Sequence, residues 1–390
     1  MSPLLLILLL LQACSPSANS QTEVPQSDMD ESSASPQAVF IGTYTRDEGF
    51  VNGQSDGIQL AWLDPQTGAF SNASTAAKLI NPSWVVRHPN GKVLYAVSEL
   101  AHADEPTGFL HSFAISEDQS LKPVSKIETV GQAPCHISVD QSGRYVFVAN
   151  YVGGIVKMYQ TSETGELTPS DEVAFDSAPL AHPRQEASHT HMASISPDNK
   201  FLYVPDLGAN KVWCFVIDHE NGKLKPAEVP FTEVQIAAGP RHMRFHPNGT
   251  FAYLINELDA SVNLYHYDQT TGALQFQQTK SSLPEGYDQV KSCAALRVHP
   301  SGKFLYGSNR GHDSIVIFSI DEETGELTLV GFEATLGKAP RAFNISQDGR
   351  FLFAANQDSG NIITFQIDMR TGKLSRQSEF ELATPVCLDL

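Results

Sequence analysis

Six copies of one short segment recur along this chain, and this internal repeat constrains the fold more than any other feature. One copy reads HPNGKVLYAVSEL, and later copies include HPNGTFAYLINEL and HPSGKFLYGSNRG. Their matching turn residues lie 47 to 56 residues apart, at Gly91, Gly143, Asn199, Gly249, Gly302 and Gly349. Repeats of about this length are typical of propeller blades or solenoid turns.

Each repeat consists of short strands. A run such as KFLYVPD is followed by a second alternating run such as KVWCFVID, and neither run has helical spacing. A second glycine turn follows in almost every repeat, at Gly68, Gly165, Gly222, Gly272, Gly325 and Gly372. Four short antiparallel strands per repeat predict the blade of a β-propeller.

The two ends of the chain supply one further blade. AVFIGTY, which begins at Ala38, resembles the second strand of a repeat, but no first strand precedes it. TPVCLDL, which ends at Leu390, resembles the missing first strand. Joining the two ends would remove two open sheet edges. We therefore expect an all-β fold with seven blades of four antiparallel strands, in which the C-terminal strand closes the first blade.

The N-terminal region differs from the rest of the chain. An apolar run from Leu4 to Leu11 is too short to span a bilayer and ends in Leu-Gln-Ala-Cys. This pattern predicts a lipoprotein-type signal peptide over 1–14 with lipidation at Cys14. A Ser-, Pro- and acid-rich stretch over 15–37 predicts a flexible tether, and 38–390 forms the propeller. We expect a bacterial envelope protein, lipid-anchored with the propeller in the periplasm or outside, or secreted if Cys14 is not lipidated.

Charge and cysteine content limit the partners. The net charge of −18 argues against nucleic acid and against acidic membrane surfaces, so membrane contact is expected only through the anchor. An anionic substrate would need a local basic pocket. Four further cysteines have no C-x-x-C spacing and are expected to pack in the interior, with their disulfide state open: Cys135, Cys214, Cys293 and Cys387.

Comparison of the repeats separates scaffold positions from site positions. Eight residues before each turn residue stand Ser83, Cys135, His191, Arg241, Ala294 and Arg341. Eight residues after it stand Glu99, Tyr151, Leu207, Glu257, Arg310 and Gln357. Residues equidistant from a hairpin turn lie side by side, so both columns are expected at one mouth of the central channel. The charged members form a candidate anion site: His191, Arg241, Glu257, Arg310 and Arg341.

Other polar residues of the repeats are expected to serve the scaffold. The position one residue before the second column holds short polar side chains, which should cap strand ends. These are Asn150, Asp206, Asn256, Asn309 and Asn356. Arg244 and Arg297, with His246 and His299 before their turns, are expected in blade packing.

A metal site is the weaker interpretation of the histidines. His189 and His191 are two residues apart and could face one side of a strand, as metal ligands do. Only Glu257 and either His242 or His182 could complete the site, and the arginines would repel a cation. We expect no metal and no other cofactor.

Nearly the whole propeller, from about Val39 to Leu390, resembles a known family. The most specific stretches are HTHMASISPDNKFLYVPDLGANKVW, GPRHMRFHPNGTFAYLINELDASV and GKFLYGSNRGHDSI. They resemble the seven-bladed lactonases of the 6-phosphogluconolactonase type, which include fungal carboxymuconate lactonising enzymes. Strands such as YVFVANYVGG also resemble the wider YVTN-type surface propellers. In the lactonising enzymes the active site contains an inner-strand His, an inner-strand Arg, a Glu after the next strand and an Arg of the following blade. In this chain the residues that match these four are His191, Arg241, Glu257 and Arg310.

This resemblance implies metal-independent hydrolysis of a small anionic or sugar lactone, or of a related cyclic ester. Glu257 or His191 would activate a water, and Arg241 and Arg310 would face the developing oxyanion. Four further residues are expected to bind substrate: Arg341, His189, Gln357 and Lys291. Cytoplasmic sugar phosphates fit an exported protein poorly, so the substrate could lack a phosphate.

Two alternatives stay open. The same residues could perform a muconate-type cycloisomerisation, with an internal carboxylate in place of water. The protein could also be a noncatalytic envelope propeller that binds a carbohydrate or a protein. The segment from Ala174 to Thr190 exceeds the usual link between blades, and it either shapes access to the site or forms an inert surface loop.

Overall fold

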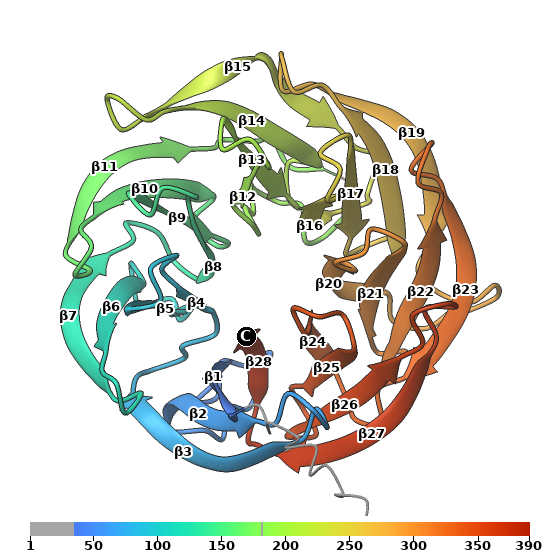
Figure 1. Ribbon diagram of the computed structural model, residues 1–390. Coiled ribbons are helices and arrows are strands. Elements are labelled where there is room, and N and C mark those ends of the chain that lie inside the picture. Colours follow the sequence, from blue (N-terminus) through green and yellow to red (C-terminus); the bar gives the residue numbers. More distant parts are fainter. Residues whose placement is uncertain (1–34, 181) are drawn as a thin grey trace, which may run out of the picture. The chain divides into compact units, whose positions relative to one another are not determined.

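The computed structural model describes residues 35–180 and 182–390, and these form one compact unit from Ser35 to Leu390. The expected signal peptide, the lipidation site at Cys14 and most of the tether lie outside the described residues. Seven four-stranded antiparallel sheets are arranged in a ring around a central channel (Figure 1). Nothing in the described part of the chain is a helix long and apolar enough to cross a membrane. The prediction of an all-β, seven-bladed propeller is confirmed.

Each blade has its shortest strands near the channel. From the channel outward, the blade built from both chain ends consists of β28 (Pro385–Asp389), β1 (Gln37–Thr43), β2 (Gly57–Leu63) and β3 (Phe70–Lys78). The next consists of β4 (Val85–Arg87), β5 (Val93–Ser98), β6 (Phe109–Ile115) and β7 (Leu121–Glu128). The third consists of β8 (Pro134–Val139), β9 (Tyr145–Asn150), β10 (Ile155–Thr161) and β11 (Leu167–Ala174).

The remaining four blades follow the same order. The fourth consists of β12 (Ser194–Ile195), β13 (Phe201–Asp206), β14 (Lys211–Asp218) and β15 (Lys223–Glu233). The fifth consists of β16 (Pro240–Phe245), β17 (Phe251–Asn256), β18 (Ser261–Tyr267) and β19 (Leu274–Ser281). The sixth consists of β20 (Ser292–Val298), β21 (Phe304–Arg310), β22 (Ser314–Ile320) and β23 (Leu327–Ala334). The seventh consists of β24 (Pro340–Ile345), β25 (Phe351–Asn356), β26 (Asn361–Ile367) and β27 (Leu374–Glu381).

The chain ends meet in the first blade, as expected. Strand β28 pairs antiparallel with β1, so that Phe40 lies opposite Asp389 and Ile41 opposite Leu388. Figure 1 shows the C-terminus beside β28 at the channel. This pairing joins the two ends of the ring through backbone hydrogen bonds and covers the inner edge of β1, so that β28 becomes the innermost strand of that blade.

The hydrophobic pattern follows the depth of each strand. Five of the seven second strands are buried along their whole length, as in VLYAVS of β5, because neighbouring blades cover both of their faces. The outer strands β19 and β27 are buried and exposed in a mixed pattern, since one face meets solvent. Tyrosines of the second strands also bond the next blade: Tyr203 and Tyr253 donate to the carbonyls of Gly272 and Gly325 at 2.6 and 2.9 Å.

A histidine before the inner turn joins successive blades. Nε2 of His246 donates to the Gly302 carbonyl at 2.8 Å, and His299 makes the same bond to the next blade. Gly302 has a φ of +77°, and a Cβ there would lie 2.7 Å from His246 Nε2. The turn therefore needs glycine for both its backbone conformation and the close approach of the ring. The expectation that these histidines serve blade packing is confirmed.

Candidate active site

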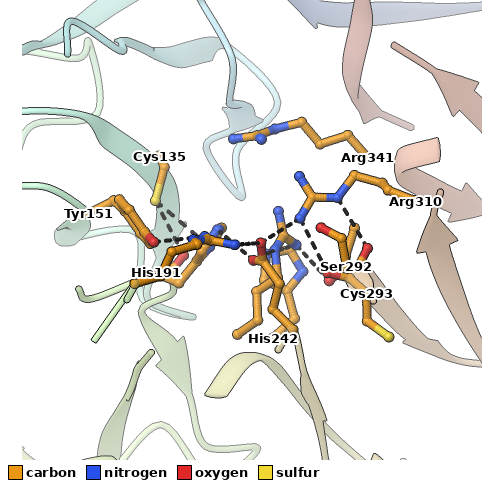
Figure 2. A network of polar contacts seen from close by, with 12 residues as sticks. Cys135, Tyr151, His191, His242, Ser292, Cys293, Arg310 and Arg341 are labelled. Atoms are coloured by element: carbon orange, nitrogen blue, oxygen red, sulfur yellow. Dashed lines mark hydrogen bonds and ion pairs between the residues drawn. The ribbon is translucent and has the colours of Figure 1, made fainter. Parts of the chain in front are cut away.

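A cavity of about 520 Å³ lies at the end of the channel where the inner strands begin. Members of both repeat columns line it: Glu99, Cys135, Tyr151, His191, Glu257, Arg310, Arg341 and Gln357. Figure 2 shows Arg310 and Arg341 on one side of a polar network, with Cys135, Tyr151 and His191 on the other. Eight of the twelve residues in the two columns therefore line one cavity, whereas Ser83, Leu207, Arg241 and Ala294 do not.

Three guanidinium groups hold the carboxylate of Glu257. Its Oε1 accepts from Arg184 Nη1 at 2.6 Å and lies 2.8 Å from Arg310 Nη2. Its Oε2 accepts from Arg241 Nε at 3.0 Å. Burial alone would raise the pKa of Glu257, but Arg310, Arg184 and Arg241 more than offset this and hold it well below its usual value. The carboxylate is therefore ionised and only weakly basic.

His191 lies beside this carboxylate. Its Nε2 is 4.0 Å from Glu257 Oε2, and its Nδ1 is 3.9 Å from the Sγ of Cys135. The rings of Tyr151 and His242 pack edge-on against it. Burial, followed by the charge of Arg241, lowers the pKa of His191 well below 6.5, although Glu257 opposes the shift. The imidazole is therefore neutral at pH 7 and can accept a proton.

Arg241 reaches Glu257 from behind the cavity wall. Its side chain is only 1% exposed and does not line the cavity. Besides Glu257 it contacts the Ala294 carbonyl through Nη1 at 2.6 Å and His242 Nε2 at 3.1 Å. Burial and the charge of Arg310 lower the pKa of Arg241 to about 9, so the group remains charged at neutral pH. Arg241 therefore contacts Glu257 and is not placed to contact a molecule in the cavity.

A second carboxylate faces Arg341. The Nη2 of Arg341 is 3.6 Å from Glu99 Oε1, and its guanidinium lies 5.3 Å from the centre of the Tyr44 ring. Ser83 donates a hydrogen bond to the other oxygen of Glu99. Because Glu99 makes only a long contact with Arg341, this guanidinium can bind a ligand anion across the cavity from His191.

The other expected substrate-binding residues differ in their positions. Gln357 lines the cavity and donates from Nε2 to Asp358. His189 lies beneath Tyr151, with the two rings stacked 4.6 Å apart and its Nδ1 3.0 Å from the Tyr151 carbonyl. Lys291 is exposed and does not line the cavity, although its neighbour Ser292 does. His189 is placed to position Tyr151 and not to touch a ligand.

Several lining residues were not expected from the sequence. Arg184 belongs to the long segment Ala174–Thr190, whose length was the only signal that it shapes the site. It also donates to the hydroxyl of Tyr151 at 2.8 Å. Glu48 and Phe50 come from the connection between β1 and β2, which lies outside the repeat pattern and carried no signal.

The cysteines give no nucleophile at this site. Cys135, Cys214, Cys293 and Cys387 are all buried and free, so none forms a disulfide with another. Burial, followed by the charge of Glu99, strongly raises the pKa of Cys135, and its thiol stays protonated at neutral pH. Within 35–180 and 182–390, no three His, Cys, Asp or Glu side chains are grouped as metal ligands would be.

Comparison with known proteins gives the family. Residues 38–390 match the family model described as lactonase, 7-bladed beta-propeller. A 6-phosphogluconolactonase of Bacillus subtilis is 32% identical over 305 residues, which cover 78% of this chain and 83% of the relative. A 6-phosphogluconolactonase of Formosa agariphila is 34% identical over 314 residues, covering 79% and 86%. The solved structure of a periplasmic gluconolactonase of Pseudomonas aeruginosa superposes with a TM-score of 0.84 at 31% identity, covering 91% of this chain and 98% of that one. The chain belongs to the family of seven-bladed β-propeller lactonases.

Proposed function

We propose that this protein hydrolyses a sugar lactone or a related cyclic ester without a metal. The names of its relatives, 6-phosphogluconolactonase and gluconolactonase, support a lactone as the substrate. The observation that carries the proposal is the pairing of a neutral His191 with a carboxylate, Glu257, that three guanidinium groups hold. Both residues line a cavity large enough for a sugar ring.

His191 is the better base of the two candidates. The lone pairs of Glu257 are largely taken by N–H donors, whereas the imidazole of His191 is neutral and faces the cavity. In the proposed reaction, His191 takes a proton from a water as that water attacks the lactone carbonyl. The resulting imidazolium lies 4.0 Å from Glu257, and the carboxylate stabilises it.

The guanidinium groups that line the cavity stabilise the charge of the tetrahedral intermediate. Arg310 and Arg184 both reach the cavity, so their N–H groups can face the oxyanion. The intermediate then collapses, the bond from the carbonyl carbon to the ring oxygen breaks, and the leaving oxygen takes the proton back from His191. Water is added overall, and the product is the open hydroxy acid. Arg241, which lies behind the wall, acts by positioning Glu257.

The side of the cavity opposite His191 binds the substrate in this proposal. Arg341 and Gln357 line it there and offer N–H donors to a carboxylate, a phosphate or ring hydroxyl groups. Phe50 is 56% exposed at the mouth and offers an apolar face to a sugar ring. A sugar lactone with one anionic or strongly polar substituent would match this arrangement.

The sequence also supports a proposed location. The apolar run and Cys14 predict export and lipidation, so we place the propeller in the cell envelope, tethered through 15–37. Metabolic labelling with a radioactive fatty acid tests this, because a C14S variant should lose the label and the parent should carry it.

The enzymatic test uses the purified chain, a panel of phosphorylated and plain sugar lactones, and a chelator. E257Q and H191Q should each lower kcat/KM at least about 10²-fold. E326Q is the matched control, because Glu326 is exposed on an outer turn and should keep the parent rate. Full activity in both E257Q and H191Q would refute the assignment. Lack of turnover of every lactone by the folded parent would instead favour the noncatalytic binding protein, and formation of a lactone from a carboxylated muconate would favour the cycloisomerase.

A further inference from the structure

A second cavity of about 500 Å³ occupies the channel beyond the active site. It is lined by the later parts of the inner strands, whereas the first cavity is lined by their beginnings. Cys135 faces the first cavity and His136 the second, and the same holds for His191 and Met192. The two cavities have no lining residue in common.

A layer of buried rings separates the cavities. The rings of Trp84 and His136 lie 4.3 Å apart, and that of His242 lies 5.8 and 5.9 Å from them. His242 also contacts the ring of His191, so the layer supports the floor of the active site. A molecule in the second cavity would therefore not compete directly with substrate.

Two arginines of neighbouring blades line the second cavity. Arg244 comes from β16 and Arg297 from β20. Both were expected in blade packing, and both do contact a neighbouring blade: Arg244 Nη1 lies 3.4 Å from the Sδ of Met192, and Arg297 Nε donates to Asn344 at 3.3 Å. The structure adds that each side chain also reaches the cavity.

Neither guanidinium has an anionic partner among the described residues. Their other hydrogen bonds go to main-chain carbonyls, from Arg244 to Met243 at 3.0 Å and from Arg297 to Leu296 at 3.1 Å. Every ion pair in the described part of the chain involves other cations. Of the residues that the structure describes, one lines this cavity with an acidic side chain, and that residue, Asp389, lies 3.2 Å from Arg87 instead.

Placing two unpaired positive charges in one cavity is unfavourable. Burial and the charge of Arg297 lower the pKa of Arg244 well below its usual value, and burial lowers that of Arg297 to about 10. The active site shows the opposite arrangement, since Arg184, Arg241 and Arg310 all contact Glu257. A bound dianion would remove the imbalance in the second cavity.

We propose that the second cavity binds a small ligand that carries a phosphate or another tetrahedral dianion, held between Arg244 and Arg297. Two guanidinium groups match the charge of a phosphate and can each donate two parallel hydrogen bonds to it. The apolar wall formed by Trp84, Ile137 and Phe245 accommodates the remainder of a compact ligand. This site is separate from the proposed lactonase site and does not depend on that function.

Calorimetric titration of the full chain with inorganic phosphate and with sulfate tests the proposal, with acetate and chloride as monoanion controls. R244M and R297M should each weaken phosphate binding at least tenfold. R341M, which alters the active-site cavity, should keep it. R244M and R297M should also keep the parent kcat/KM for a lactone.

Thermal unfolding supplies a second measurement. Phosphate should raise the unfolding midpoint of the parent and not that of R244M, while R244M without phosphate should unfold no earlier than the parent because it lacks an unpaired charge. If R244M fails to fold, R244K tests the same point, since it keeps the charge and loses the paired donors and should bind phosphate more weakly than the parent. Phosphate binding that is unchanged in R244M, R297M and R244K, or that is lost only in R341M, would show that water alone fills this cavity and would overturn the proposal.

Discussion

Acid should destabilise this propeller because four histidines are buried in their neutral form. Burial is the main cause that holds the pKa of His136, His191 and His242 well below 6.5, and it lowers the pKa of His111 to about 4. The unfolded chain binds protons at these positions near pH 6.5, and the folded chain does not. Their contribution to stability is therefore fully present above pH 6.5 and is lost as the pH falls below it.

The size of the effect follows from the proton balance. Lowering the pH from 7.0 to 5.5 costs about 1.2 kcal/mol per neutral histidine, or roughly 5 kcal/mol for four. Asp389 opposes this, because burial raises its folded pKa to about 6. Its carboxylate lowers stability above pH 3.8 and most strongly above pH 6, so acid relieves about 0.8 kcal/mol of that cost over the same interval. The free energy of unfolding should fall by about 4 kcal/mol in total.

Urea unfolding at pH 7.0 and pH 5.5 measures this difference. H136Q is the informative variant, since it removes one of the four buried histidines without adding a charge. Its loss of stability between the two pH values should be smaller than that of the parent by about 1.2 kcal/mol, whatever its stability at pH 7.0. A loss under about 1 kcal/mol in the parent, or an equal loss in parent and variant, would show that these histidines accept protons in the folded state.

Three further predictions concern the site and the scaffold. R184M should lower kcat/KM for a lactone by about 10- to 100-fold, because Arg184 holds Glu257 from the cavity side. The unfolding midpoint should change little, because the side chain is 45% exposed. An unchanged kcat/KM would remove Arg184 from the mechanism. Lactonase activity should show no inflection near pH 6.5, since the pKa of His191 lies well below that value, and a pH–rate profile that falls by half at pH 6.5 would contradict it. G302A should lower the free energy of unfolding by more than about 2 kcal/mol, through backbone strain and the clash with His246. G91A has a similar φ and open space around the new Cβ, so urea unfolding should show a loss of only about 1 kcal/mol; equal losses would mean that the His246 contact adds nothing.

The repeat explains why so much of the fold could be predicted. A turn glycine recurs at five of the six inner hairpins, with Asn199 at the other, and the buried second strands repeat a similar apolar run. Strand order and blade number therefore follow from alignment of the chain with itself. The closure by β28 could be predicted for the same reason, because each chain end resembles one half of a repeat. Residues that depart from the repeat at equivalent positions then indicated the cavity.

Positions outside the repeat could not be found in this way. Arg184 lies in an insertion, and its contact with Glu257 depends on how that segment folds back over the mouth. A shared position in the repeat also does not show in which direction each side chain points. Arg241 and Arg341 occupy the same repeat position, yet the first points behind the wall and the second into the cavity. Both arginines stand at a β-bulge of their inner strand, between Pro240 and His242 and between Pro340 and Ala342. Register alone therefore does not determine the direction of each guanidinium.

The charge balance of the cavity links the scaffold to the proposed chemistry. The chain carries a net charge of −18, which would repel an anionic transition state from most of its surface. Around the active site, two carboxylates, Glu99 and Glu257, meet the guanidinium groups of Arg184, Arg241, Arg310 and Arg341. The third carboxylate on the wall, Glu48, pairs with Arg46 at 2.5 Å, and Arg46 also pairs with Glu105. The four arginines therefore exceed Glu99 and Glu257 by two positive charges. Hydrolysis of a lactone adds one negative charge to the substrate in the transition state, beyond any charge that the substrate already carries. Because different segments supply these arginines, the ring closure that holds the blades together also holds this positive charge in place.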